Sequence, residues 1–138
     1  MVFWLGIGSI ENWEYGLEQG GVWGVRERYQ KAWDRVKQND VLFFYVMRPV
    51  KGIIGYGTIS SKERHLKSFW PEERKEGISL WPLHLRIEVD FCLPRDKWEM
   101  NRISLPSLSQ GITIQRALQE LREGVAQDLL GQFPRDKR

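Results

Sequence analysis

The chain has 138 residues, of which 41% are hydrophobic and 28% are charged, and its net charge is +3. This length and apolar fraction suit one domain with a buried core, and the small excess of base is compatible with nucleic acid as a partner. The single cysteine, Cys92, excludes a disulfide within the chain and is typical of a reducing compartment, so we expect a cytoplasmic protein.

The N-terminal part of the chain predicts a strand followed by two helices. Residues 2–7, VFWLGI, are short and apolar and predict the strand. Ser9 is a good N-cap residue, so a helix is expected over residues 10–17. In residues 26–37, apolar side chains recur every three or four positions, which predicts an amphipathic helix with a basic outer face.

The central part predicts a strand pair, a long loop and a further strand. Residues 41–47, VLFFYVM, form a continuous apolar run typical of a central strand, and residues 53–60 predict its antiparallel partner. Residues 61–79 are rich in charge and show no sustained period, so we expect a long loop, which is often a functional feature. Regular alternation over residues 82–93 is the clearest strand signal in the sequence.

The C-terminal part predicts mostly helix. Residues 94–105 indicate a turn and a short strand, Thr113 is expected to cap a helix over residues 114–123, and residues 125–133 indicate a last helical segment. The alternation of strands and helices that builds a parallel doubly wound sheet is absent. We therefore expect one α+β domain over residues 1–138, a small barrel of mostly antiparallel strands flanked by helices.

Catalytic and cofactor motifs are missing from the sequence. It contains no phosphate-binding loop, dinucleotide fingerprint, nucleophile elbow or zinc deaminase signature, and two histidines with one cysteine cannot build a usual zinc site. His84, Glu88 and Asp90 lie on one strand face and could form an acid–base set, but a solvated strand face shows the same pattern. We expect a protein that is not an enzyme, holds no metal or cofactor, and has no membrane-spanning segment.

Two of the seven tryptophans stand apart from any apolar stripe. Trp23 lies in a glycine-flanked segment, GGVWGV, and Trp70 lies in the long polar loop. Basic residues gather beside both: residues 22–37 hold five basic and two acidic side chains, and residues 62–75 hold five and three. Because lysine and arginine neutralise phosphates and indole rings stack on bases, this combination predicts nucleic-acid binding.

The other five tryptophans are interpreted differently. Trp4, Trp33 and Trp81 fall in apolar patterns and are assigned to the core, whereas Trp13 and Trp98 fit either place. A plainer interpretation of Trp23 and Trp70 also stays open, in which each ring covers the edge of the core and the nearby charges keep the loops solvated.

The order and spacing of several short motifs resemble the EVE domain, a member of the PUA-like superfamily whose sister family is the YTH domain. The most specific motifs are ENW at residues 11–13, WGV at residues 23–25, and a run through Asp40, Phe44, Tyr45 and Gly55. The resemblance implies a PUA-like pseudo-barrel and a pocket for a modified base. Modules of this kind also resemble the N-terminal readers of McrBC-type restriction systems.

The resemblance implies roles for individual residues. Trp23 and Trp70 would be the opposite walls of an aromatic cage, and the base would lie between their rings. Asn12 would hydrogen-bond to the base edge, and Ser9 and Tyr45 would line the pocket. Phosphate contacts are expected from the basic residues beside the two rings, Arg26, Lys31, Arg64, Lys67 and Arg74.

We therefore predict a non-enzymatic reader that flips a modified base, N6-methyladenine in DNA, into an aromatic cage. DNA is favoured over RNA, and a separate motor or nuclease partner would act on the bound DNA. Alternatives stay open: a standalone RNA-binding protein that reads a modified cytosine or another base, and a protein-interaction module anchored by Trp70. An enzyme that uses His84 with Glu88 is the third alternative.

Overall fold

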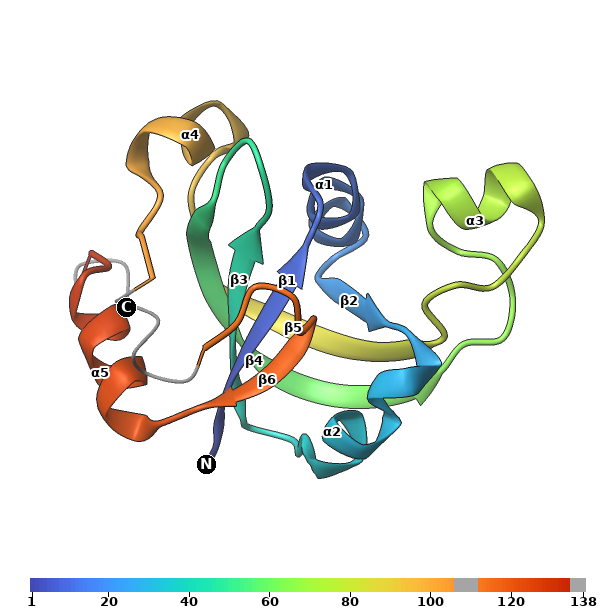
Figure 1. The fold of residues 1–138 in the computed structure, drawn as a ribbon, viewed down its shortest axis with the longest axis horizontal. Coiled ribbons are helices and arrows are strands. Elements are labelled where there is room, and N and C mark those ends of the chain that lie inside the picture. The colour runs from blue at the N-terminus through green and yellow to red at the C-terminus, as the bar shows by residue number, and fades with distance from the viewer. Residues whose placement is uncertain (106–111, 135–138) are drawn as a thin grey trace.

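The computed structural model describes residues 1–105 and 112–134, and its main feature is a six-stranded sheet in the order β2-β5-β4-β3-β1-β6 (Figure 1). β1 and β3 run parallel, and the other four neighbouring pairs are antiparallel. The expected α+β class with mostly antiparallel strands is confirmed. The strands are β1 (Phe3–Gly8), β2 (Val22–Val25), β3 (Val41–Val46), β4 (Gly52–Arg64), β5 (Leu83–Cys92) and β6 (Leu118–Leu121).

The helices are short and lie around the curled sheet. In Figure 1, α5 covers the left-hand side, α1 and α2 lie on the opposite side of β1, and α3 projects at the far right. No helix in the described part of the chain is long and apolar enough to cross a membrane. The helices are α1 (Ile10–Glu18), η1 (Glu27–Tyr29), α2 (Gln30–Arg35), α3 (Pro71–Glu76), η2 (Arg95–Lys97), α4 (Trp98–Asn101) and α5 (Glu123–Gly131).

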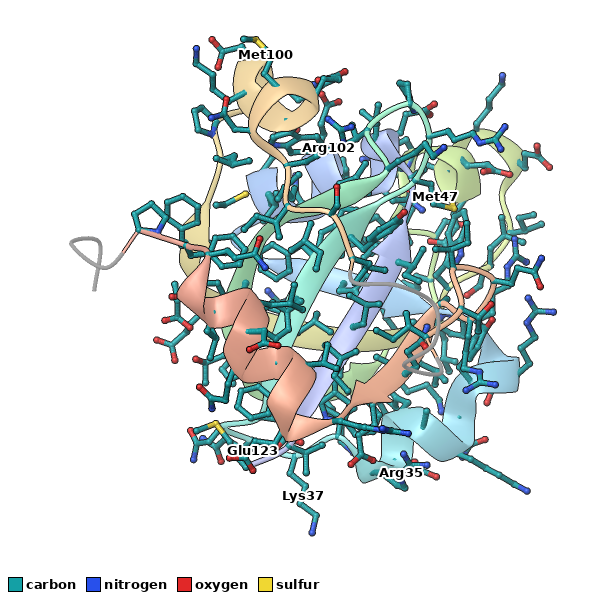
Figure 2. All side chains as sticks on the ribbon, turned by 60° about the vertical axis from the view of Figure 1, so that its left-hand side comes forward. Arg35, Lys37, Met47, Met100, Arg102 and Glu123 are labelled. Atoms are coloured by element: carbon teal, nitrogen blue, oxygen red, sulfur yellow. The ribbon has the colours of Figure 1, made fainter. Side chains whose placement is uncertain are left out.

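Strand alternation divides the core into two clusters, one on each face of the sheet. In β1, Trp4 joins the inner cluster that the curled sheet encloses, whereas Phe3 and Leu5 join the outer cluster. The outer cluster is covered by α5, which comes forward in Figure 2. Register shifts in the β4–β5 pairing accompany the curl, as bulges do in other sheets.

Asp40 fastens the N-terminal strand to the segment before β3. Its buried carboxylate accepts hydrogen bonds from the backbone N–H of Val2 (2.9 Å), the indole N–H of Trp4 (3.0 Å) and the backbone N–H of Lys37 (2.9 Å). A buried carboxylate is tolerated only when such donors replace its water. Asp40 of the sequence motif therefore has a structural role that fixes β1 beside β3.

The strands over residues 2–7, 41–47 and 82–93 and the helix over residues 10–17 are confirmed, as is the antiparallel partner of the 41–47 strand. The last helical segment is confirmed as α5, and the short strand expected in residues 94–105 is reduced to one bridge between Ile53 and Ile103. The expected amphipathic helix over residues 26–37 is divided into η1 and the six-residue α2.

Two predictions in the polar segments are wrong. The helix expected over residues 114–123 is instead β6, which pairs with the free edge of β1 and thereby satisfies its backbone groups. The loop expected over residues 61–79 is shorter, because β4 continues to Arg64 and residues 71–76 form α3. Pro71 at the first position of that helix is a favourable start.

Candidate nucleic-acid interface

A hollow of about 340 Å³ opens where the C-terminal end of β1 meets the start of α1 and the strand β2. This volume lies within the roughly 300–1,000 Å³ typical of small-molecule sites. Met47, labelled in Figure 2 at the turn after β3, borders the hollow. The other lining residues are Ile7, Gly8, Ser9, Asn12, Trp23, Gly24, Val25, Arg26, Arg28, Tyr29, Glu72, Trp81, Ile114, Gln115 and Ala117.

Three of the five residues expected at the base line this hollow: Ser9, Asn12 and Trp23. Ser9 is also the N-cap of α1, and its hydroxyl accepts a hydrogen bond from the backbone N–H of Asn12 at 3.1 Å. The cap therefore fixes the first turn of α1, from which the side chain of Asn12 reaches the hollow. The sequence predicted the helix start from the Ser9 cap, whereas the roles of Ser9 and Asn12 at the base came from the resemblance carried by the short motifs.

Trp23 and Trp70 do not form the expected cage with parallel walls. Their ring centroids are 6.4 Å apart, but the planes meet at 71°, an edge-to-face contact that leaves no room for a base between them. The rings are only 2% and 1% exposed. Trp23 instead stacks on Trp13, with centroids 4.2 Å apart and planes 3° from parallel.

Glycines explain why these indole rings can pack so deeply. A Cβ at Gly8 would lie 2.0 Å from Cη2 of Trp23, and a Cβ at Gly24 would lie 2.7 Å from Nε1 of Trp70. Both rings therefore occupy space that side chains would fill. The sequence shows the glycines that flank Trp23, but such glycines can mark either an open loop or a place where rings pack closely against the backbone. The structure has the close packing.

Trp70 is enclosed by the core and does not line the hollow. The prediction that Trp70 forms the wall opposite Trp23 is therefore wrong, because its ring is buried and does not reach the hollow. The alternative of a protein-interaction module anchored by Trp70 is wrong for the same reason, because a ring that is 1% exposed offers no surface to a partner.

Tyr45 lies on the opposite face of the sheet from Trp23. Its side chain joins the outer cluster beneath α5, whereas its neighbour Phe44 joins the inner one. Burial raises the pKa of Tyr45, and the nearby Arg102 guanidinium partly offsets that rise. Tyr45 contributes its backbone to this region, because its carbonyl accepts the indole N–H of Trp13 at 2.9 Å.

The second tryptophan at the hollow is Trp81, which sequence reasoning assigned to the core. It is half-buried and precedes β5, and the guanidinium carbon of Arg26 lies 5.4 Å from its ring centroid. Such a ring can stack on a base or a cation. Trp81 was assigned to the core because it stands next to the alternating strand. The residues that surround its ring come from distant segments, which the local sequence does not reveal.

Glu73 holds Trp81 and Trp70 in place. One carboxylate oxygen accepts the backbone N–H groups of Phe69 (2.8 Å) and Trp70 (3.0 Å), and the other accepts those of Leu80 (2.7 Å) and Trp81 (2.7 Å). Glu73 itself is 1% exposed. One buried carboxylate therefore closes the segment between β4 and β5 into a fixed loop.

Of the five basic residues expected to contact phosphates, Arg26 is the one that lines the hollow. Arg64 pairs with Glu27, and Arg74 donates to the hydroxyl of Tyr15 at 3.3 Å. Lys31 on α2 and Lys67 after β4 are exposed and do not line the hollow. Arg28, which was not among the expected residues, lines it beside Arg26.

His84 does not join Glu88 and Asp90 in a solvated acid–base set. It is 3% exposed and stacks on His65, with ring centroids 4.8 Å apart, whereas Glu88 and Asp90 are exposed. The enzyme alternative built on this strand face therefore lacks the shared geometry it requires. Within the described residues, no group of three or more histidine, cysteine, aspartate or glutamate side chains is arranged to hold a metal ion.

Mild acid is expected to destabilise the protein through His84. Burial, reinforced by the neighbouring His65, lowers the pKa of His84 from 6.5 to about 4. The unfolded chain therefore binds the proton first, and stability that is complete above about pH 6.5 falls as the pH drops toward 4, by roughly 3 kcal/mol at 1.36 kcal/mol per pKa unit. Denaturant unfolding between these pH values measures the loss.

The variant His84→Leu should flatten that pH dependence, and the control His65→Gln should keep most of it because burial is the larger cause. An unchanged slope in His84→Leu would show that another group titrates in this range.

Comparison with solved structures places the curled sheet in the class of PUA-like α+β folds. The chain is similar to Rpa0253 from Rhodopseudomonas palustris, with a TM-score of 0.58 and 13% identity over 96% of this chain and 92% of that one. It is also similar to the YTH domain of Zygosaccharomyces rouxii MRB1 protein in complex with N6-methyladenosine RNA. The TM-score is 0.59, with 14% identity over 94% of this chain and 84% of that one. ASCH from Zymomonas mobilis is a third similar structure, with a TM-score of 0.58 and 14% identity over 94% of each chain.

The family is shown by sequence. The EVE domain model matches residues 2–107, so the chain belongs to the EVE domain family. A UPF0310 protein of Pyrococcus abyssi is 41% identical over 46 residues, which span 33% of this chain and 32% of that protein. The resemblance drawn from the short motifs is thereby confirmed.

Proposed function

We propose that the protein is a non-enzymatic reader that binds nucleic acid and receives one modified base in the hollow lined by Trp23 and Trp81. The observation that carries the proposal is the composition of this hollow. It combines the half-buried indole ring of Trp81, with the buried Trp23 as part of the wall, polar side chains from Ser9 and Asn12, and guanidinium groups from Arg26 and Arg28. Rings stack on bases, polar groups recognise base edges and guanidinium groups bind phosphates.

The finer proposal is that the base is N6-methyladenine in DNA, flipped out of its strand by a protein that works in the cytoplasm. Flipping costs a few kcal/mol, less where pairing is already weak. Because the hollow supplies recognition and no catalytic set, a separate motor or nuclease partner would act on the bound DNA. A reader of modified RNA is the second candidate, favoured by the methylated RNA held by the similar Zygosaccharomyces rouxii YTH domain.

The test is a titration of one oligonucleotide sequence with adenine or N6-methyladenine, as single-stranded DNA, duplex DNA and RNA at one fixed salt concentration. Burying a methyl group contributes about 0.8 kcal/mol, so the methylated form should bind about fourfold tighter or better. Equal affinity for methylated and plain oligonucleotides in all three forms would overturn N6-methyladenine as the ligand. A parallel series with modified cytosine tests the remaining alternative.

Removing the ring of Trp81 should weaken this binding. Stacking contributes roughly 1–3 kcal/mol per base, so Trp81→Ala is expected to lose about 5- to 150-fold in affinity for the modified oligonucleotide. Fluorescence anisotropy measures the loss.

The matched control is Trp33→Ala, which removes another half-buried tryptophan that does not line the hollow. Equal losses in the two variants, at equal thermal stability, would show that Trp81 does not contact the base.

A further inference from the structure

Arg28 borders three hollows, one of which is the proposed base site. A second hollow is lined by Ser79 and Leu80 together with Arg26, Glu27 and Arg28. A third is lined by Thr113, Gln115 and Arg116 together with Arg28 and Tyr29. The three hollows therefore share Arg28 of η1; the second also shares Arg26 with the base site, and the third also shares Tyr29 and Gln115 with it.

We propose that these hollows form one continuous track for the strand that carries the modified base. The strand crosses over Ser79 and Leu80, places its base in the base site and leaves over the turn at residues 113–116. Arg26, Arg28 and Arg116 contact successive phosphates along this path. The inference deepens the proposed function, on which it rests, and replaces the phosphate contacts expected from Lys31, Arg64, Lys67 and Arg74.

The charges along the track are available for an anion. Among residues 1–105 and 112–134, Arg26, Arg28 and Arg116 take part in no salt bridge, whereas Arg64 pairs with Glu27 and Arg35 pairs with Glu120. All three track arginines are exposed. A guanidinium group matches the geometry of a phosphate with two parallel hydrogen bonds, which makes arginine well suited to this contact.

Aromatic faces hold two of these guanidinium groups over the track. Arg26 lies over the ring of Trp81, and the guanidinium carbon of Arg28 lies 5.2 Å from the ring centroid of Tyr29. Such contacts orient a flexible side chain without using its hydrogen-bond donors. Both groups therefore keep their donors for phosphate oxygens.

The far side of the third hollow is a fixed structure. Gln119 is buried, and its side-chain amide donates to the carbonyls of Thr113 (2.7 Å) and Arg116 (2.9 Å). Its side-chain oxygen accepts the backbone N–H of Thr113 at 3.2 Å. The hydroxyl of Tyr29 donates to the carbonyl of Gln115 at 3.4 Å and ties this turn to η1. The backbone of Arg116, which lines the third hollow together with Arg28, is thus held in place.

The experiment measures how the affinity of the full chain depends on salt, using a modified and a plain single-stranded oligonucleotide. A phosphate contact on a single strand releases about 0.7 counterion, so each arginine removed should flatten the slope of log K against log salt by about that amount. At 0.1 M salt, Arg28→Ala and Arg116→Ala are each expected to lose about fivefold in affinity, equally for both oligonucleotides.

The matched controls are Lys67→Ala and Arg74→Ala, two exposed basic residues outside the three hollows, which should keep both affinity and slope. If the wild-type protein prefers the modified oligonucleotide but the slope falls in these controls and not in Arg28→Ala and Arg116→Ala, the track is wrong and the proposed function stands. If the wild-type protein binds neither oligonucleotide, both are overturned. A thermal melt of each variant checks that it is folded.

Discussion

Glu73→Gln is expected to lower the free energy of unfolding by about 2–6 kcal/mol. Glutamine keeps one oxygen acceptor, but its NH₂ group would face two of the four backbone N–H groups that the carboxylate now accepts. Each buried donor left without a partner costs about 1–3 kcal/mol. Because whole domains are stable by only about 5–15 kcal/mol, denaturant unfolding should show this loss clearly.

The loss should extend to the proposed base site, because two of the four donors belong to Leu80 and Trp81. The matched control is Glu76→Gln, an exposed change in the same helix α3, which should alter stability by less than about 0.5 kcal/mol. Equal stability of the two variants would show that the four hydrogen bonds of Glu73 do not hold the loop.

The same carboxylate makes the protein sensitive to stronger acid. Burial raises the pKa of Glu73, but the four backbone donors together outweigh burial, so the pKa is lowered from its ordinary 4.5. A lowered pKa in the folded state means that the stability due to Glu73 is present above about pH 4.5 and is lost as the pH falls through the folded value. As the pH falls below about 4.5, Glu73→Gln should therefore lose less stability than the wild-type protein.

Gly8→Val is expected to cost about 3 kcal/mol of stability and to displace the ring of Trp23. A Cβ at this position would lie 2.0 Å from Cη2 of Trp23, and that ring is held from another side by its stack on Trp13. Overpacking of a filled core typically costs 1–3 kcal/mol, and valine adds two further methyl groups. Denaturant unfolding measures the cost.

The clash can be separated from other effects of the substitution by a double variant. Trp23→Leu in the Gly8→Val background should recover part of the lost stability, a coupling that independent sites do not show. The control Gly124→Val, in α5, adds a side chain where no atom lies within 4 Å and should be nearly neutral. Strictly additive losses at Gly8 and Trp23 would contradict the packing described for this corner.

Local patterns predicted the elements whose stability is decided by near neighbours. The apolar run of β3, the alternation of β5 and the Ser9 cap of α1 are examples, because each signal lies within the element itself. The segment that became β6 shows the opposite. Its residues suit a helix, but they form a strand because they pair with the edge of β1 that would otherwise be unpaired.

The site was predicted in part. Short motifs located Ser9, Asn12 and Trp23, which lie close together because α1 and β2 follow β1 directly along the chain. Trp81 and Arg28 were missed as members of the same hollow, because they are separated by more than 50 positions in the sequence. Tyr45 was placed on the wrong face because one residue along a strand reverses the direction of a side chain.

The sequence by itself determined the α+β class, most strands, the family and the concentration of aromatic and basic residues near Trp23. Periodicity, capping and motif spacing are properties of neighbouring residues, so they can be recognised without coordinates. Only the tertiary structure decided which rings face each other, that Trp70 is enclosed and Trp81 is accessible, and which arginines lie without acidic partners. Those outcomes depend on how a curled sheet brings distant segments together, and no local pattern encodes that geometry.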